Sequence, residues 1–152
     1  MAKSIHDVEA GDIISVYNRD FITDQVYKLG AGPAATVNMR LKDGNDIRWM
    51  AVRKQEGSDL LVVGEQVDLE SEECGEQLTL ADRKFNLVGE KSGRAIGTSS
   101  MGYPRYVNMD YYDYAADSGD IYLFVQKEPD SRVAFSGEAV INSAVMVFPK
   151  PK

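Results

Sequence analysis

The chain has 152 residues and a hydrophobic content of 43%, which is enough to build the core of one domain or of two small ones. Its 24 acidic and 17 basic residues give a net charge of -7, which argues against nucleic acid as a partner and against docking on an anionic membrane. The single cysteine, Cys74, cannot form an internal disulfide, and the single histidine, His6, excludes a zinc site built from several Cys and His side chains.

Residues 1–10 are predicted to form an N-terminal extension. Ser4 followed by Asp7 resembles a helix N-cap, but the segment is too short to hold a stable helix alone. It also lacks the apolar core of a secretory signal, and no run in the chain approaches the roughly 18 apolar residues of a membrane span. We therefore expect a cytoplasmic protein without direct membrane insertion, in which His6 is an exposed or packed terminal residue.

The first predicted element is a β-hairpin in residues 11–23. Ile14 and Val16 alternate with polar neighbours, as in a strand with one buried face. Residues 18–20 are polar and predict a tight turn, after which Phe21 opens the returning strand.

This hairpin recurs in residues 75–87, which align with residues 11–23 without a gap and predict a second turn at residues 82–84. The two glycines that open these segments match, as do Phe21 and Phe85. Three further matches follow in the same order along the chain: residues 32–41 with 102–111, residues 46–51 with 120–125, and residues 60–67 with 133–140. We therefore predict an internal duplication, with repeats at residues 11–70 and 75–148.

Each repeat is expected to supply four or five short strands, joined by turns such as residues 43–45 and 117–119. Gly64 and Gly137 predict a bulge in the last strand of each repeat, and the acidic residues 68–73 predict a solvated linker. The expected fold is all-β, an internally duplicated antiparallel barrel or two packed sheets with approximate two-fold symmetry. We expect one domain over residues 11–152, because packing the repeats together stabilises the fold by about 25 cal/mol per Å² of apolar surface.

Trp49 is predicted to be the core anchor of the first repeat, with Leu123 as its counterpart in the second. The repeats differ most in their aromatic residues, because six of the eight tyrosines fall between residues 103 and 122. Together with neighbouring aspartates they favour a site for a cationic or sugar-like ligand, or for a partner protein. The alternative is that these tyrosines are ordinary strand residues whose rings pack. The predicted ligand-binding or partner-binding residues are Tyr103, Tyr106, Tyr111, Tyr112, Tyr114, Asp110 and Asp113.

No catalytic residue, metal or cofactor is assigned by the sequence. Residues 89–102 are rich in Gly and Ser, but they lack the Walker pattern and are typical of a loop between strands. Cys74 has no basic neighbour to activate it, and a single histidine cannot supply a Ser-His-Asp set. The aspartate spacing misses that of a calcium-binding loop.

The pattern resembles a bacterial family known as domain of unknown function 4178, from about Val8 to Phe148. The resemblance is carried by Gly11-Asp12, Arg48-Trp49-Met50-Ala51-Val52, Gly75-Glu76 and Phe135-Ser136-Gly137-Glu138-Ala139-Val140. It implies no established activity and no catalytic residues, and it implies a loose association with membrane-stress and polyamine-related gene sets.

The leading hypothesis is a non-enzymatic β module that binds a protein partner or a small ligand through its tyrosine-rich face. A second hypothesis is an accessory enzyme that uses surface carboxylates and the segment 89–102. A third is a structural subunit that associates with itself, as a homo-oligomer.

Overall fold

The computed structural model describes residues 2–71, 73–100 and 102–151. Three residues of the predicted segments lie outside these ranges: Met1 of the extension, Glu72 of the linker and Met101 of the Gly-rich segment. The strands are β1 (Ile13–Val16), β2 (Arg19–Leu29), β3 (Thr36–Asp43), β4 (Asp46–Gln55), β5 (Ser58–Val67), β6 (Gln77–Leu80), β7 (Arg83–Ser99), β8 (Gly102–Ala116), β9 (Ile121–Lys127), β10 (Arg132–Val140) and β11 (Val145–Phe148), with short 3-10 helices η1 (Ile5–Asp7), η2 (Gly32–Ala34) and η3 (Asn142–Ala144).

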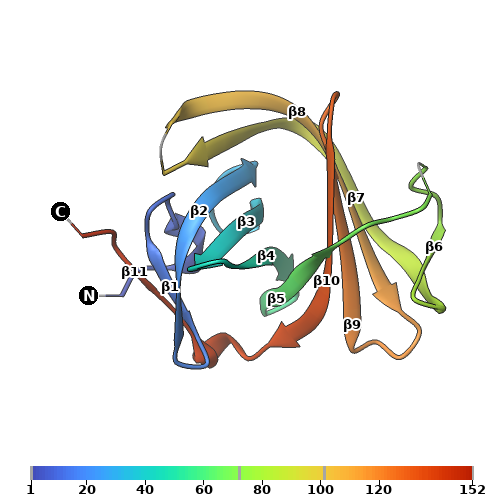
Figure 1. The fold of residues 1–152 in the computed structure, drawn as a ribbon, viewed down its shortest axis with the longest axis horizontal. Helices are drawn as coiled ribbons and strands as arrows, with labels where there is room; N and C mark the ends of the chain where they lie inside the picture. Colours follow the sequence, from blue (N-terminus) through green and yellow to red (C-terminus); the bar gives the residue numbers. More distant parts are fainter. Residues whose placement is uncertain (1, 72, 101, 152) are drawn as a thin grey trace.

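The strands form one antiparallel sheet in the order β11-β1-β2-β3-β4-β5-β10-β9-β8-β7-β6. An additional pairing of β2 with β7 closes eight strands into a ring, in the order β2-β3-β4-β5-β10-β9-β8-β7. Strands β1, β11 and β6 lie outside this ring. Figure 1 shows the long hairpin of β7 and β8 arching across one side of the ring. The prediction of an all-β fold is confirmed, as one sheet that closes on itself without forming a clean barrel.

Two hairpins turn on pairs of residues with positive φ. Tyr17 and Asn18 have φ of 48° and 67°, and Ala81 and Asp82 have φ of 51° and 63°. These pairs are the two-residue loops of β1–β2 and β6–β7, and positive φ at both positions is the type I′ geometry that suits the twist of a hairpin. Both turns therefore lie one residue before the predicted residues 18–20 and 82–84.

The two halves of the chain meet along β5 and β10, where Gly64 lies opposite Gly137. A Cβ atom on Gly64 would overlap the carbonyl of Ser136, and one on Gly137 would overlap the carbonyl of Val63. The pairing continues through both glycines without a shift, so the predicted bulges are wrong. The glycines are needed instead because the two backbones approach closely.

The strand register supports only part of the predicted alignment between the repeats. Thr23 N–H donates to the Asp12 carbonyl, and Leu87 N–H makes the corresponding bond to the Glu76 carbonyl, each at 2.8 Å. Asp12 and Thr23 in residues 11–23 thus occupy the same places as Glu76 and Leu87 in residues 75–87, as the predicted alignment requires. The match between residues 60–67 and 133–140 also holds at the paired glycines.

The two middle blocks do not keep their predicted match. Trp49 lies opposite Gly64, but the residue opposite Gly137 is Tyr122 and not Leu123. The predicted counterpart of Trp49 is therefore displaced by one residue, which turns it to the other face of the sheet. Similarly, Met39 and Met109 belong to different core clusters. The duplication itself stays a prediction.

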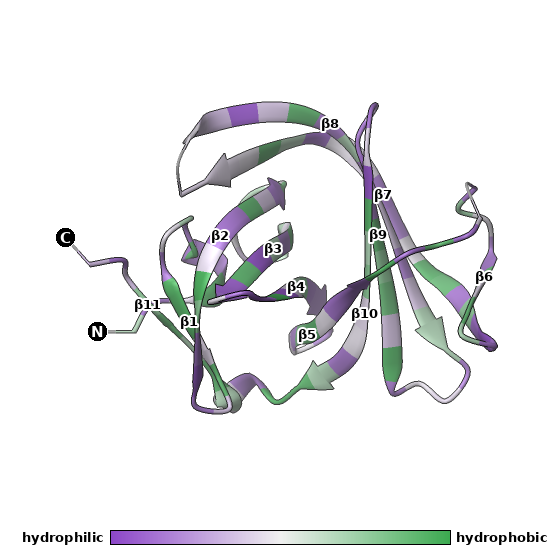
Figure 2. Ribbon diagram, viewed as in Figure 1, coloured by the Kyte–Doolittle hydropathy of each residue, from purple (hydrophilic) through white to green (hydrophobic). Residues whose placement is uncertain are grey.

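The core consists of an interior cluster within the ring and two clusters outside it. Trp49, which is 2% exposed as predicted for a core anchor, stacks on Phe135 with ring centroids 5.7 Å apart. Asn38 on β3 donates a hydrogen bond to Gln126 on β9 at 2.9 Å, and because these strands are not neighbours in the sheet the bond crosses the ring. Figure 2 shows the alternation of apolar and polar residues that gives strands such as β2 and β8 two different faces. The interior cluster comprises Tyr27, Trp49, Ala51, Val62, Ala95, Val107, Met109, Tyr111, Phe124 and Phe135.

The predicted extension and linker are both attached to the sheet. Val8 is 1% exposed and belongs to the cluster outside β1–β5, so the extension packs as part of the core. His6 accordingly is a packed residue, with its Nε2 2.8 Å from Asp59 Oδ2. The linker between β5 and β6 is mostly exposed, and Arg132 donates hydrogen bonds to its Leu69 and Ser71 carbonyls.

Candidate functional site

The structure does not bring the predicted site residues together on one face. Tyr103 and Tyr106 are 94% and 62% exposed near the β7–β8 turn, whereas Tyr111 and Tyr114 are buried further along β8. Tyr114 packs outside the ring and donates its hydroxyl to the Gly75 carbonyl at 2.9 Å. Half-buried Tyr112 packs against the same outer cluster, and Asp110 is also half-buried. Of the predicted residues, Tyr111 and Asp113 line a common pocket.

This pocket lies where β3 begins, β4 ends and β5 begins, and we call it the ring-mouth pocket. Its volume is about 260 Å³. Aromatic and aliphatic side chains form much of its wall, as is usual for sites that bind small molecules. The lining includes Thr36, Arg53, Leu60, Tyr111, Asp113, Tyr122 and Phe124, with exposed Lys54, Glu90 and Lys91 around them.

A partly buried ion pair braces the pocket from one side of the ring to the other. Arg53 on β4 donates from Nε to Asp113 Oδ2 at 2.7 Å and from Nη2 to Oδ1 at 3.1 Å. Its Nη1 donates to the Val37 and Val52 carbonyls at 3.0 and 3.2 Å. The guanidinium also lies 4.9 Å from the centre of the Phe124 ring, in cation–π geometry. Because four of its five N–H donors are already engaged, Arg53 acts as a frame for the pocket.

Two polar atoms in the ring interior lack hydrogen-bond partners among the described residues. They are the hydroxyl of Tyr111, whose side chain is 1% exposed, and Oδ1 of Asn38. Burial raises the pKa of Tyr111 above its ordinary value, so the phenol is neutral at pH 7 and available as a donor. A buried polar group without a partner costs about 1–3 kcal/mol, so one that persists requires an explanation.

Arg53 and Asn38 were missed from the sequence. A weak signal for Arg53 was present, because it continues the inward alternation of Trp49 and Ala51 and so places a charge at a core position. Asn38 offered no comparable signal, since its partner Gln126 is 88 residues away in the sequence.

The segment 89–102 was predicted to be a loop, but its residues up to Ser99 belong to β7. Two of its glycines leave room for side chains of β2. A Cβ atom on Gly93 would lie 2.8 Å from Leu29 Cδ1, and one on Gly97 would lie 3.0 Å from the Tyr27 ring. The loop on which the enzyme hypothesis depended is therefore absent from the described residues.

The described residues give little support for a cysteine nucleophile, a metal site or a membrane-spanning helix. Burial raises the pKa of the half-buried Cys74 thiol, which opposes formation of a nucleophilic thiolate. Within residues 2–71, 73–100 and 102–151, no group of three or more His, Cys, Asp or Glu side chains is arranged to hold a metal ion. The helices in these ranges are single short turns, and none has the length and apolarity to cross a membrane.

Comparison with known families gives one match. A family model described as a domain of unknown function, DUF4178, covers residues 9–142, which confirms the resemblance seen in the sequence. No curated protein and no solved structure matches the chain.

Proposed function

The chain belongs to this family of unknown function, and from its geometry we propose that it is a non-enzymatic module that binds a small aromatic ligand in the ring-mouth pocket. The observation that carries the proposal is the unpartnered Tyr111 hydroxyl beside a pocket lined by aromatic rings. In the complex, this hydroxyl donates a hydrogen bond to an acceptor on the ligand, and the bond removes the cost of leaving the hydroxyl unpaired.

The charges around the pocket favour a neutral ligand over a cationic one. Arg53 and Asp113 neutralise each other through two hydrogen bonds. The exposed groups around them are two lysines, Lys54 and Lys91, and one carboxylate, Glu90. A cation would therefore meet a slight excess of positive charge, whereas a neutral ring can lie against the half-buried Tyr122 without an electrostatic cost.

Benzamide and benzamidine test the proposal, because they share a ring but only neutral benzamide has a carbonyl acceptor. Binding can be followed through the emission of Trp49, the single tryptophan. Trp49 stacks on Phe135, and Phe135 stacks on Phe124 of the pocket with centroids 5.3 Å apart. We expect benzamide to bind more tightly than benzamidine, and Tyr111→Phe to lose about tenfold in benzamide affinity.

The matched control is Tyr114→Phe, because this buried hydroxyl contacts the Gly75 carbonyl outside the ring. It should leave benzamide affinity unchanged. The two variants should also differ without ligand, where Tyr111→Phe keeps or raises the free energy of unfolding and Tyr114→Phe lowers it by about 1 kcal/mol. Equal benzamide affinity in wild type and Tyr111→Phe, or no binding at millimolar concentration, would contradict the proposal.

A protein partner on the β7–β8 hairpin is a second candidate. Tyr106 and Ile96 face each other across the two strands and are 62% and 40% exposed. Arg94 covers the Tyr106 ring at 5.3 Å, and aromatic and Arg side chains are enriched in protein interfaces. Light scattering of wild type and Tyr106→Ser would detect self-association through this face, and equal masses for both at the monomer value would exclude it.

A further inference from the structure

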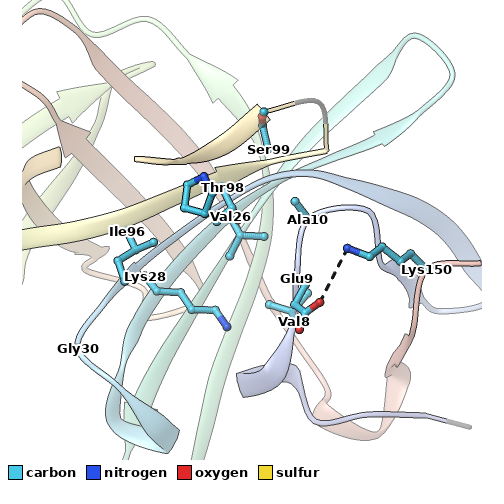
Figure 3. Close-up of a pocket in the computed structure, with 12 residues that line it drawn as sticks. Val8, Glu9, Ala10, Val26, Lys28, Gly30, Ile96, Thr98, Ser99 and Lys150 are labelled. Atoms are coloured by element: carbon cyan, nitrogen blue, oxygen red, sulfur yellow. Dashed lines mark ion pairs between the residues drawn. The ribbon is translucent and has the colours of Figure 1, made fainter. Parts of the chain in front are cut away.

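A second pocket, of about 360 Å³, lies beneath the N-terminal segment and shares no lining residue with the ring-mouth pocket. We call it the strap pocket (Figure 3). Its walls come from the segment with Val8, from β2 with Val26 and Lys28, and from β7 with Ile96 and Thr98. The wall is apolar over much of its area, but it also carries the side chains of two lysines.

The N-terminal wall of the strap pocket is held in place by the buried carboxylate of Asp12, which is 1% exposed. Asp12 accepts hydrogen bonds from the backbone N–H groups of Glu9 at 2.8 Å and Lys150 at 3.0 Å, and its Oδ2 lies 2.8 Å from the Lys3 ammonium. The first and last segments of the chain are thus fastened together beside the pocket. A wall fixed in this way can form a defined binding site without a ligand present.

Lys28 has no acidic partner at ion-pair distance among the described residues. Its half-buried ammonium donates a hydrogen bond to the His6 carbonyl at 3.2 Å, and Figure 3 shows it pointing from β2 toward the segment with Val8 and Glu9. Burial lowers its pKa, although the nearby carboxylates of Asp7 and Glu9 oppose that effect. The other lysine of the pocket, Lys150, lies 3.9 Å from Glu9.

We propose that the strap pocket binds a small amphipathic monocarboxylate, whose carboxylate pairs with the Lys28 ammonium and whose apolar tail lies against Val8, Val26 and Ile96. One lysine without an acidic partner among the described residues matches a single negative charge. A polyanion would need more free cations than this pocket offers, because Lys150 already pairs with Glu9. Thr98 and Ser99 also line the pocket, and each has a hydroxyl that can donate a hydrogen bond.

Calorimetric titration of the full chain with octanoate, octanol and octylammonium tests the proposal, because these probes share one tail and differ in the charge of the head. We expect octanoate to bind about tenfold more tightly than octanol, with octylammonium weaker still. Lys28→Met keeps an apolar stem and removes the charge, so it should abolish the preference for octanoate over octanol. Lys28→Glu should make octylammonium the preferred probe.

Lys84→Met is the control, since Lys84 is exposed on β7 and lines neither pocket. It should bind octanoate like wild type. Lys28→Met should fold, because the change removes a desolvated ammonium, and thermal unfolding checks this. Equal affinity of wild type for octanoate and octanol, or an unchanged preference in Lys28→Met, overturns the proposal. Octanoate-induced NMR shifts at Phe124 instead of Val8 and Ile96 would also overturn it, because they would place the probe in the ring-mouth pocket.

Discussion

Asp12 illustrates how one buried carboxylate holds distant parts of the chain together. Burial by itself raises its pKa, but hydrogen bonds from Lys3 and from the backbone N–H groups of Glu9 and Lys150 outweigh burial, so the pKa lies below its ordinary value. A carboxyl whose pKa is lower in the folded than in the unfolded state stabilises the fold at pH values above the unfolded value of about 3.9. That contribution is lost as the pH falls through the folded pKa.

We predict that Asp12→Asn lowers the free energy of unfolding at pH 7 by about 1–3 kcal/mol, because the amide cannot replace the charge-assisted bonds. The difference from wild type should shrink as the pH falls below about 4. Urea unfolding between pH 7 and pH 3 measures both effects. Asp20→Asn, at an exposed position of β2, should match wild type throughout, and an equal loss in that control would show that Asp12 has no special role.

The residues of the candidate site could be predicted only in part. Tyr111 and Asp113 were found because tyrosines and aspartates gather along β8. Alternation along a strand puts Tyr112 on the opposite face from Tyr111 and Asp113, but the sequence could not show which of the two faces points into the ring, since the register of the pairing decides it. Arg53 and Asp113 are 60 residues apart, and neither is informative without the other.

At the scale of elements, alternation of apolar and polar residues predicted the first strands correctly. The Gly and Ser content of residues 89–102 wrongly predicted a loop where β7 continues to Ser99. Glycine and serine normally indicate a loop, yet here Gly93 and Gly97 make room for Leu29 and Tyr27 of another strand. The hairpin turn at Tyr17 was displaced because tyrosine is an uncommon residue at positive φ. The neighbouring residues in the sequence indicate neither the contacts of the β7 glycines with β2 nor the positive φ of Tyr17.

The seam between β5 and β10 gives a sharp prediction. Gly64→Ala and Gly137→Ala should each lower the free energy of unfolding by about 1–3 kcal/mol or more, because the added Cβ overlaps backbone that cannot move without separating the strands. Gly75→Ala is the control, since a Cβ atom there meets nothing within 4 Å. Denaturant unfolding of the three variants is the measurement, and equal midpoints for Gly64→Ala and Gly75→Ala would show that the seam has room for a side chain.

At the scale of the whole molecule, the two halves of the chain are joined along β5–β10 and β2–β7, and also by side chains across the interior. The Arg53–Asp113 pair is such a link, because β4 and β8 are not neighbours in the sheet. That the chain forms one cooperative domain stays a prediction, which unfolding experiments would test directly.

We predict that Asp113→Asn lowers the free energy of unfolding by about 3–5 kcal/mol, because it leaves the Arg53 guanidinium charged and unpaired in the interior. The double variant Arg53→Met with Asp113→Leu should recover much of this loss, since it removes both charges and keeps apolar volume. Chemical denaturation of the three proteins is the measurement. A double variant no more stable than Asp113→Asn would mean that the pair contributes through its geometry and not through charge balance.

Closure of the ring also constrains when the protein can complete its fold during synthesis. The β2–β7 pairing joins residues 25–28 to residues 96–99, and β5 meets a strand that begins only at Arg132. Until those later strands leave the ribosome, β2 and β5 each have an edge whose final partner does not yet exist. Unpaired edges readily add strands from other chains, so the first half is most exposed to aggregation during translation. We therefore expect the chain to be most prone to aggregation between synthesis of β5 and synthesis of β10.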